Sequence, residues 1–262
     1  MPLSDLRHRL LLAVRRLKSR HGRAAGARQP IVLHEDADLL ISWLPGAGHR
    51  AVLAFAGMVV ALGGRQPLEF VGVASAEGRH VLFVSDLRHS WYSHPGLQDR
   101  IVRVVQDFCA AQGITDLCTI GNSMGGYGAI LFASLLPVRH VAAFVPQILL
   151  TPELLAMQQW DEARACIQHG VVRDLVPGML TSTARFTLVY GDQDIDDNIH
   201  AAHLPKAANI DPLIVKGCDH KVSRWLKDRG VLAALGSAML DGRADLVDHF
   251  RHSLNQDAAL AV

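Results

Sequence analysis

The sequence is poor in cysteine and in aromatic residues. Its 262 residues include 4 cysteines, which are widely spaced and form no C-x-x-C pair, and 6% of the residues are aromatic. A disulfide framework is therefore not expected, which fits a reducing compartment and leads us to expect a cytoplasmic protein. Because 50% of the residues are hydrophobic, the chain can bury a sizeable core without disulfides or metals.

The chain also lacks an excess of charge of either sign. Lys+Arg amount to 26 and Asp+Glu to 25, which gives a net charge of +1. A surface that binds nucleic acid is normally basic, so this balance argues against nucleic acid as a partner.

Long hydrophobic runs are missing as well. No apolar stretch approaches the roughly 20 residues that a membrane-spanning helix needs. Residues 1–20 carry one short apolar run, Leu10–Val14, which stops at Arg15 and is too short for a secretory signal. We expect these residues to form an amphipathic basic helix that packs on the domain or on a partner, with contact to an anionic membrane surface as the alternative.

Beyond a linker that ends at residue 30, strand-like and helical runs alternate to the C-terminus. We expect residues 1–30 to be an N-terminal helix and linker, and residues 31–262 to form one α/β domain. The strand-like runs are Ile31–His34, Asp38–Trp43, Ala51–Phe55, His80–Ser85, Leu117–Ile120, His140–Val145, Arg185–Tyr190 and Pro212–Val215. The first two are predicted to form an antiparallel hairpin at the sheet edge, and the others a parallel sheet buried on both faces. Helices are predicted near 67–76, over 97–112, and around 223–240 and 244–254.

A G-x-S-x-G pattern centred on Ser123 stands between a strand-like run and a run suited to a helix. This pattern indicates a nucleophile elbow only in that context, in which the central residue adopts a strained backbone conformation. Gly121 and Gly125 would then let the strand and the helix pack closely around the turn. The sequence therefore predicts Ser123 as a nucleophile.

A serine hydroxyl needs a base to accept its proton and a carboxylate to orient that base. Active sites of parallel sheets lie at the carboxyl ends of the strands. His220 follows the last strand-like run. The acids that follow the preceding strand-like run are Asp192, Asp194, Asp196 and Asp197.

With this order of serine, acid and histidine, residues 51–240 resemble the α/β-hydrolase superfamily. The resemblance implies an α/β-hydrolase fold, with a mostly parallel sheet, helices on both faces and a small cap at about residues 151–180. It implies no metal and no organic cofactor. In that superfamily the acid commonly stands three residues after a glycine that ends its strand, which selects Asp194, with Asp192 as runner-up. Asp196 and Asp197 would then face solvent or cap the following helix, and His220 matches the histidine.

The resemblance also implies two backbone donors for the oxyanion. One is the N–H of Met124, after the nucleophile. The other comes from the loop after an early central strand, where the chain has Gly57 and Met58 in place of the usual His-Gly; Met58 is our first choice and Gly57 the second.

Aromatic and polar residues that follow other strands are candidates for the substrate pocket. Trp91 and Tyr92 stand in a loop after a strand-like run, and they either line the pocket or pack the loop. Gln147 follows another strand and is a weaker candidate.

These observations predict a serine hydrolase that cleaves an ester or thioester of a small molecule or of an acyl carrier. An acyltransferase with the same three residues and a non-catalytic binding protein of the same fold are the alternatives. Residues 85–96, together with the segment around Ser123, are also similar to hydrolase-like proteins found with bacterial surface-polysaccharide genes.

Overall fold

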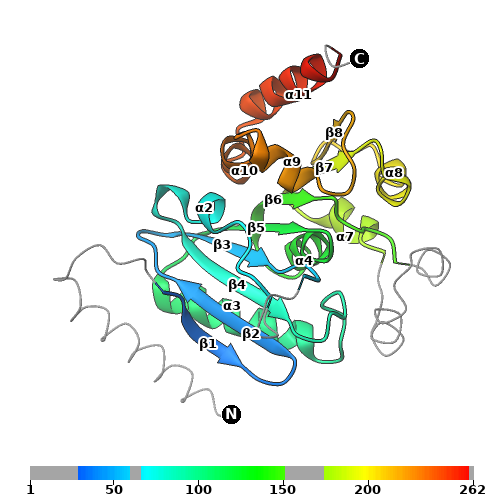
Figure 1. The fold of residues 1–262 in the computed structure, drawn as a ribbon. Coiled ribbons are helices and arrows are strands. Elements are labelled where there is room, and N and C mark those ends of the chain that lie inside the picture. Colours follow the sequence, from blue (N-terminus) through cyan, green and yellow to red (C-terminus); the bar gives the residue numbers. More distant parts are fainter. Residues whose placement is uncertain (1–28, 60–65, 151–173, 260–262) are drawn as a thin grey trace.

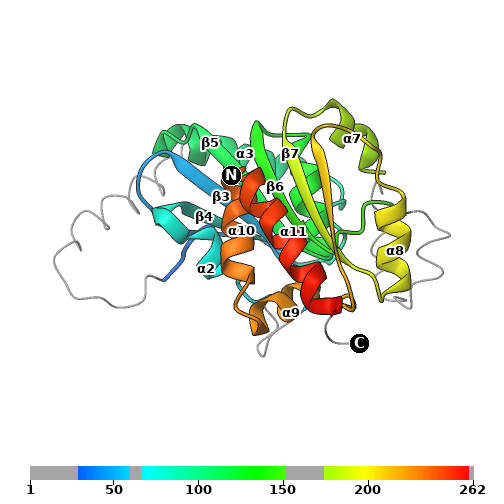
Figure 2. The ribbon, with the colours of Figure 1, turned by 90° about the horizontal axis from the view of Figure 1, so that it is seen from above.

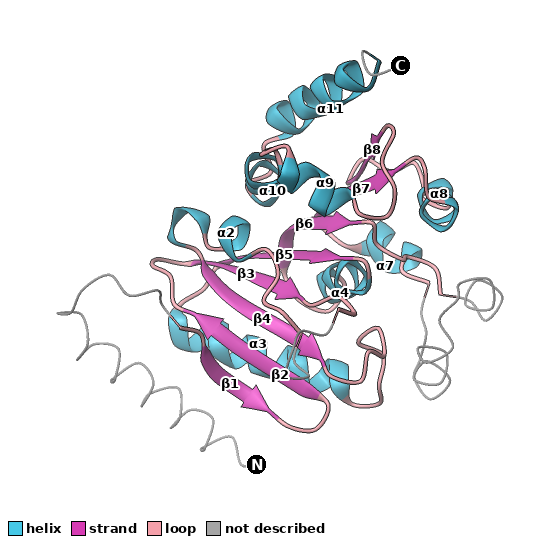
Figure 3. Ribbon diagram, viewed as in Figure 1, coloured by secondary structure: helices cyan, strands magenta, loops and turns pink. Residues whose placement is uncertain are grey.

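The computed structural model describes residues 29–59, 66–150 and 174–259, and its centre is an eight-stranded sheet (Figure 1). The strand order is β1-β2-β4-β3-β5-β6-β7-β8. The strands are β1 (Ile31–Glu35), β2 (Leu39–Leu44), β3 (Arg50–Phe55), β4 (His80–Asp86), β5 (Asp116–Asn122), β6 (Val138–Phe144), β7 (Arg185–Gly191) and β8 (Ile210–Val215). This order places β5 between β3 and β6, in the interior of the sheet (Figure 3).

The direction of the strands matches the apolar patterns of the sequence. β1 pairs with β2 and β2 with β4 in antiparallel fashion, so the predicted edge hairpin is confirmed. All other pairs are parallel. The side chains of β4 are buried along its whole length, as expected for a continuous apolar run between two helical layers.

Helices cover both faces of the sheet. The helices are α2 (Val71–Ala74), α3 (Leu97–Gln112), α4 (Met124–Ala133), α7 (Val176–Thr181), α8 (Ile195–Ala202), α9 (Val222–Asp228), α10 (Leu232–Leu240) and α11 (Ala244–Ala259). Helices α2, α10 and α11 lie over one face, and α3, α4 and α7 over the other (Figures 1 and 2). The mostly parallel sheet with two helical layers is thus as predicted.

Two predicted helices differ from the structure. Near 67–76 only α2 is helical, because Phe70 adopts a left-handed conformation with φ 56° just before it. The run at 223–240 is divided into α9 and α10, because Gly230 adopts φ +71° between them. Residues 1–28 and most of the predicted cap lie outside the described residues. No described helix combines the length and the apolarity needed to cross a membrane.

The sheet ends at β8 on the side away from the hairpin. Pro212 lies within this strand, opposite Leu188 of β7. Arg251 of α11 pairs with Asp211 and reaches the carbonyl oxygen of Pro212 at 3.5 Å. Helix α11 thus contacts the outer border of β8.

Candidate active site

Ser123 occupies the turn between β5 and α4. Its backbone angles are φ 55° and ψ −119°, a conformation that is costly for a residue with a side chain. A Cβ on Gly121 would lie 2.1 Å from the carbonyl oxygen of Gly125, so the chain can cross itself here only with glycine. The strand, tight turn and helix expected around Ser123 are therefore present.

His220 lies beside Ser123, on the loop that follows β8. Its Nε2 is 3.2 Å from Ser123 Oγ, and its Nδ1 is 2.8 Å from Asp197 Oδ1. A carboxylate only accepts hydrogen bonds, so the imidazole carries its proton on Nδ1 and leaves Nε2 free to accept from the serine hydroxyl. Three residues that follow three different strands, β5, β7 and β8, thus form one hydrogen-bonded chain.

The carboxylate that contacts His220 is Asp197, contrary to the prediction of Asp194. Asp194 is the N-cap of α8, and its Oδ1 accepts a 3.0 Å hydrogen bond from the backbone N–H of Asp197. Asp197 is 1% exposed and faces the imidazole from the first turn of the helix. The expectation that Asp197 faces solvent or caps the helix is therefore wrong, because the capping position is taken by Asp194.

The other two aspartates of this segment each have a different position. Asp192, the runner-up, accepts a 2.7 Å hydrogen bond from the backbone N–H of Gly217 and so ties together the loops after β7 and β8. Asp196 is partly exposed in the first turn of α8.

Opposing effects set the pKa of the imidazole. Burial alone would lower the pKa of His220, but the hydrogen bond to Asp197 and the negative charges of Asp197, Asp194 and Asp219 outweigh it, and the pKa lies above its ordinary value. Burial raises the pKa of Asp197, an effect that His220 opposes. The geometry and the charges together favour His220 as a base that is strengthened by a buried carboxylate.

Asp194, Asp197 and His220 have oxygen and nitrogen atoms within 4.8 Å of one another, a grouping that could hold a metal ion. His220 Nδ1 donates its proton to Asp197 Oδ1 at 2.8 Å, so this nitrogen has no lone pair left for an ion. Because Asp194 caps a helix at the same time, the group is explained by hydrogen bonding.

The predicted oxyanion donors come from two segments, one directly after Ser123 and one after β3. Met124 is the first residue of α4, and the first N–H groups of a helix have no partner within it. Gly57 and Met58 line the cavity that contains Ser123 and His220. Burial raises the pKa of the Glu69 carboxyl to about 7, and a hydrogen bond from the Gly57 backbone opposes this effect, so this N–H faces Glu69. Met58 therefore stays the first choice for the second donor.

Trp91 and Tyr92 are packed inside the molecule and line neither cavity described below. Both are 0% exposed. Trp91 Nε1 donates to Gln147 Oε1 at 2.8 Å, and the Tyr92 hydroxyl lies 2.8 Å from the carbonyl oxygen of Ala56. All three predicted pocket residues thus hold loops in place, and Tyr92 supports the segment that leads to Gly57. The rings of Trp91 and Tyr92 are buried in the core, so neither ring has a face open to a substrate.

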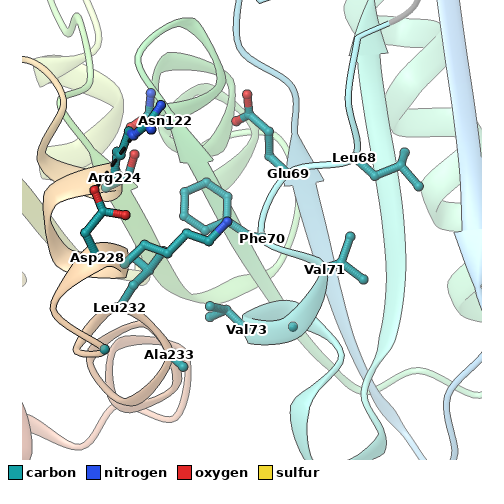
Figure 4. A pocket seen from close by; sticks show the side chains of 14 residues that line it. Leu68, Glu69, Phe70, Val71, Val73, Asn122, Arg224, Asp228, Leu232 and Ala233 are labelled. Atoms are coloured by element: carbon teal, nitrogen blue, oxygen red, sulfur yellow. Dashed lines mark ion pairs between the residues drawn. The ribbon is translucent and has the colours of Figure 1, made fainter. Parts of the chain in front are cut away.

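Two adjoining cavities open next to Ser123. The smaller, of about 370 Å³, contains Ser123 and His220. The larger, of about 780 Å³, lies between the segment before and within α2 and the helices α9 and α10 (Figure 4). The residues that line both are Glu69, Asn122, Ser223 and Arg224. A substrate with one part at Ser123 can therefore extend into the larger cavity.

Two acidic residues that matter here were not assigned to the site by the sequence analysis. Asp197 could have been found from the D-x-x-D spacing of Asp194 and Asp197, because an aspartate followed by an acid three residues later is typical of a helix N-terminus. No pattern of the sequence indicates Glu69, which reaches the site only through tertiary packing.

The fold is shared with several solved enzymes of known description. The capsule O-acetyltransferase of Neisseria meningitidis serogroup A superposes with a TM-score of 0.58 at 12% identity, over 82% of this chain and 97% of that chain. A mutant of that enzyme has been solved in complex with CoA. An esterase of Pyrobaculum calidifontis gives a TM-score of 0.55 at 12% identity, over 93% of this chain and 94% of the other. A bacterial membrane phospholipase A gives 0.50 at 20% identity, over 89% and 91%.

No protein-family model matches the sequence, and no curated protein matches it. The likeness is therefore one of structure, and it covers most of the chain. The sheet order, the turn at Ser123 and the similarity to esterases of this class show that the chain has the α/β-hydrolase fold.

Proposed function

We propose that the protein is a serine hydrolase that cleaves an ester or thioester through an acyl-enzyme on Ser123. The observation that carries the proposal is the chain of contacts from Ser123 Oγ to His220 Nε2 at 3.2 Å and from His220 Nδ1 to Asp197 Oδ1 at 2.8 Å. A non-catalytic protein would have no need of this strained serine beside an oriented imidazole.

In the first half of the reaction, Ser123 Oγ attacks the carbonyl carbon while His220 Nε2 takes the hydroxyl proton. Asp197 stabilises the imidazolium that forms, and the N–H of Met124 with that of Met58 would stabilise the negative oxygen. The bond to the leaving alcohol or thiol then breaks, and His220 returns the proton to that group. An acyl-serine remains.

In the second half, water attacks the acyl-serine. His220 removes a proton from the water as the carbon–oxygen bond forms, and it then protonates Ser123 Oγ as the acyl group leaves as an acid. The net reaction consumes one water for each ester cleaved.

An O-acyltransferase is the second candidate. It is favoured by the structural likeness to a capsule O-acetyltransferase and by the larger cavity beside Ser123, which has room for a second substrate. The steps are the same, except that an alcohol replaces water in the second half and the product is a new ester.

Covalent labelling tests the nucleophile directly. We expect a fluorophosphonate probe to modify Ser123, as located by peptide mass spectrometry, and Ser123→Ala to lose both labelling and turnover of an activated ester. Ser223→Ala is the matched control, since Ser223 lines the same cavity while the hydrogen bonds of the His220 ring go to Ser123 and Asp197. Turnover by Ser123→Ala within about tenfold of the wild-type rate would contradict the proposal.

Product analysis separates the two candidates. The enzyme is incubated with an acyl thioester in water, with and without an alcohol acceptor. If the alcohol leaves the yield of free acid unchanged, the enzyme is a hydrolase. If a new ester forms and the yield of free acid falls, the enzyme is a transferase.

A further inference from the structure

Polar side chains with unmatched oxygens gather around Gly57, next to Ser123. The buried atoms Gln66 Oε1, Glu69 Oε2 and Asn122 Oδ1 have no hydrogen-bond partner among the described residues. A Cβ placed on Gly57 would lie 3.3 Å from Glu69 Oε1 and 3.3 Å from the backbone oxygen of Asn122, so both residues flank this glycine. We call Gln66, Glu69 and Asn122 the Gly57 cluster.

Two members of the Gly57 cluster border the space that a substrate would enter. Glu69 and Asn122 line both cavities, and the smaller of these also contains Ser123 and His220. Figure 4 shows the Glu69 carboxylate and Asn122 at the same end of the larger cavity, with the ring of Phe70 beside them. A ligand bound here would lie within reach of the serine.

The cluster is short of donors. Buried acceptor oxygens normally have a hydrogen-bond partner. An acceptor without one has lost its hydrogen bonds to water without replacing them, which destabilises the protein. The Gln66 amide nitrogen is already used, because it donates to the carbonyl oxygen of Gly57 at 2.6 Å. Burial raises the pKa of Glu69 to about 7, with the hydrogen bond from Gly57 opposing it. Whether Glu69 is protonated or ionised, the cluster has more hydrogen-bond acceptors than the described residues around it have donors to pair with them.

The charge around the cavities decides which kind of donor fits. Lys221 and Arg224 line the smaller cavity, and Arg224 and Lys227 line the larger one. Asp228 also lines the larger cavity, but it forms an ion pair with Arg224 at 3.8 Å. A cationic amine would be repelled by this basic border, whereas neutral hydroxyl groups would not.

We propose that Glu69 and Asn122 form a subsite for a polyhydroxylated alcohol, which is the part of the substrate joined to the acyl group that reacts at Ser123. The unmatched oxygens of Glu69 and Asn122 are covered in this structure, so their side chains turn toward the cavity when the ligand binds and accept hydrogen bonds from its hydroxyl groups, while the ring of Phe70 packs against the carbon face of the alcohol. The inference rests on the proposed function, and it names the substrate class as esters of sugar-like alcohols. Glu69 acts here as a binding residue that sets specificity.

Selectivity between two esters tests the subsite. We compare kcat/KM for the acetyl ester of methyl glucoside with that for cyclohexyl acetate, whose alcohol has similar size and one oxygen. We expect the wild type to favour the sugar ester and Glu69→Met to lower the ratio of the two values by about tenfold to a hundredfold, mainly through KM. Glu69→Gln keeps an acceptor oxygen and should retain most of the preference. Glu77→Met is the matched control, because Glu77 is exposed and lines neither cavity. An unchanged ratio in Glu69→Met would overturn the proposal.

Binding without turnover keeps the subsite testable if the proposed reaction fails. We expect methyl glucoside to bind Ser123→Ala in a saturable way, as followed by ligand-detected NMR, and the added Glu69→Met change to abolish this binding. Methoxycyclohexane, which lacks the donors, should bind at least about tenfold more weakly. Equal binding of the two probes, or binding that survives Glu69→Met, would refute the subsite. Lack of fluorophosphonate labelling with sugar binding intact would instead refute the acyl-enzyme.

Discussion

The carboxylate that faces His220 is decided by the residue at which α8 begins. Because Asp194 is the N-cap, Asp197 lies one turn further along and faces inward. We therefore expect Asp197→Asn to lower kcat by about 10⁴-fold, through loss of the correct imidazole tautomer. Asp194→Asn is the matched control, since asparagine also caps helices well, and it should stay within about tenfold of wild type. Steady-state kinetics on an activated ester measure both.

The reverse ranking of these variants would show that Asp194 orients the imidazole during catalysis. Circular dichroism on both proteins checks that α8 is retained. Equal, small losses would show that neither carboxylate is needed.

The pH dependence of the reaction should report His220. Its pKa is raised above the ordinary value, because Asp197 and neighbouring acids outweigh burial. The base must be neutral, so kcat/KM should rise with pH along one acidic limb whose midpoint lies above about 6.5. In Asp197→Asn the residual activity should show the limb at lower pH, because burial is then less opposed. A midpoint that stays in place would assign the limb to another group.

The sequence was sufficient for Ser123 and His220, because their positions follow directly from the ends of strands. For the acid, the spacing of Asp194 and Asp197 allows the first to cap the helix, but only the hydrogen bond from the Asp197 N–H to Asp194 Oδ1 in the structure decides which of the two faces His220. The choice between pocket and loop packing for Trp91 and Tyr92 stayed open for a related reason: a loop after a strand can fold back into the core, and only packing decides which way its rings face.

At the scale of elements, the contact between α4 and β3 depends on Gly125. A Cβ there would lie 2.3 Å from the carbonyl oxygen of Phe55. We expect Gly125→Ala to lower the free energy of unfolding by about 3 kcal/mol, because the backbone must shift to relieve the overlap. Gly72→Ala is the control: no atom lies within 4 Å of its Cβ position in α2, so a change of at most about 1 kcal/mol toward higher stability is expected. Urea unfolding measures both, and equal effects would contradict the close contact.

The strands were predictable because a parallel strand that is buried on both faces has an unbroken run of apolar residues in the sequence. The bounds of the helices were harder to predict. The apolar spacing continues through Gly230, and the break between α9 and α10 comes from the left-handed conformation of that residue, which periodicity does not report.

At the scale of the molecule, buried histidines should make the fold sensitive to mild acid. His200 is 0% exposed, and burial, with the charges of His220 and His203, lowers its pKa to about 4. The unfolded chain binds this proton near pH 6.5 while the folded chain does not, so stability falls as pH drops from about 6.5 to about 4. Burial also lowers the pKa values of His80 and His140, which act in the same direction.

Urea unfolding at pH 7.5 and pH 5 checks this effect. The loss of stability between these pH values should be smaller in His200→Gln by about 2 kcal/mol. His203→Gln, on the exposed neighbour, should reduce the loss only slightly, because the charge of His203 contributes less than burial to the low pKa of His200. Equal losses in the wild type and in His200→Gln would show that the buried imidazole is not the source.

The outer border of β8 has a consequence for how copies of the chain meet one another. A sheet edge with free backbone groups can template the addition of a strand from a neighbouring molecule, which leads to domain swapping or aggregation. The carbonyl of Pro212 faces outward, where Arg251 reaches it, so the missing N–H of this proline falls on the same exposed side. An incoming strand would therefore find one donor absent, would have to displace a guanidinium group, and would meet Asp211 beside it. We therefore expect Pro212 and Arg251 to disfavour the addition of a strand at this edge of the sheet.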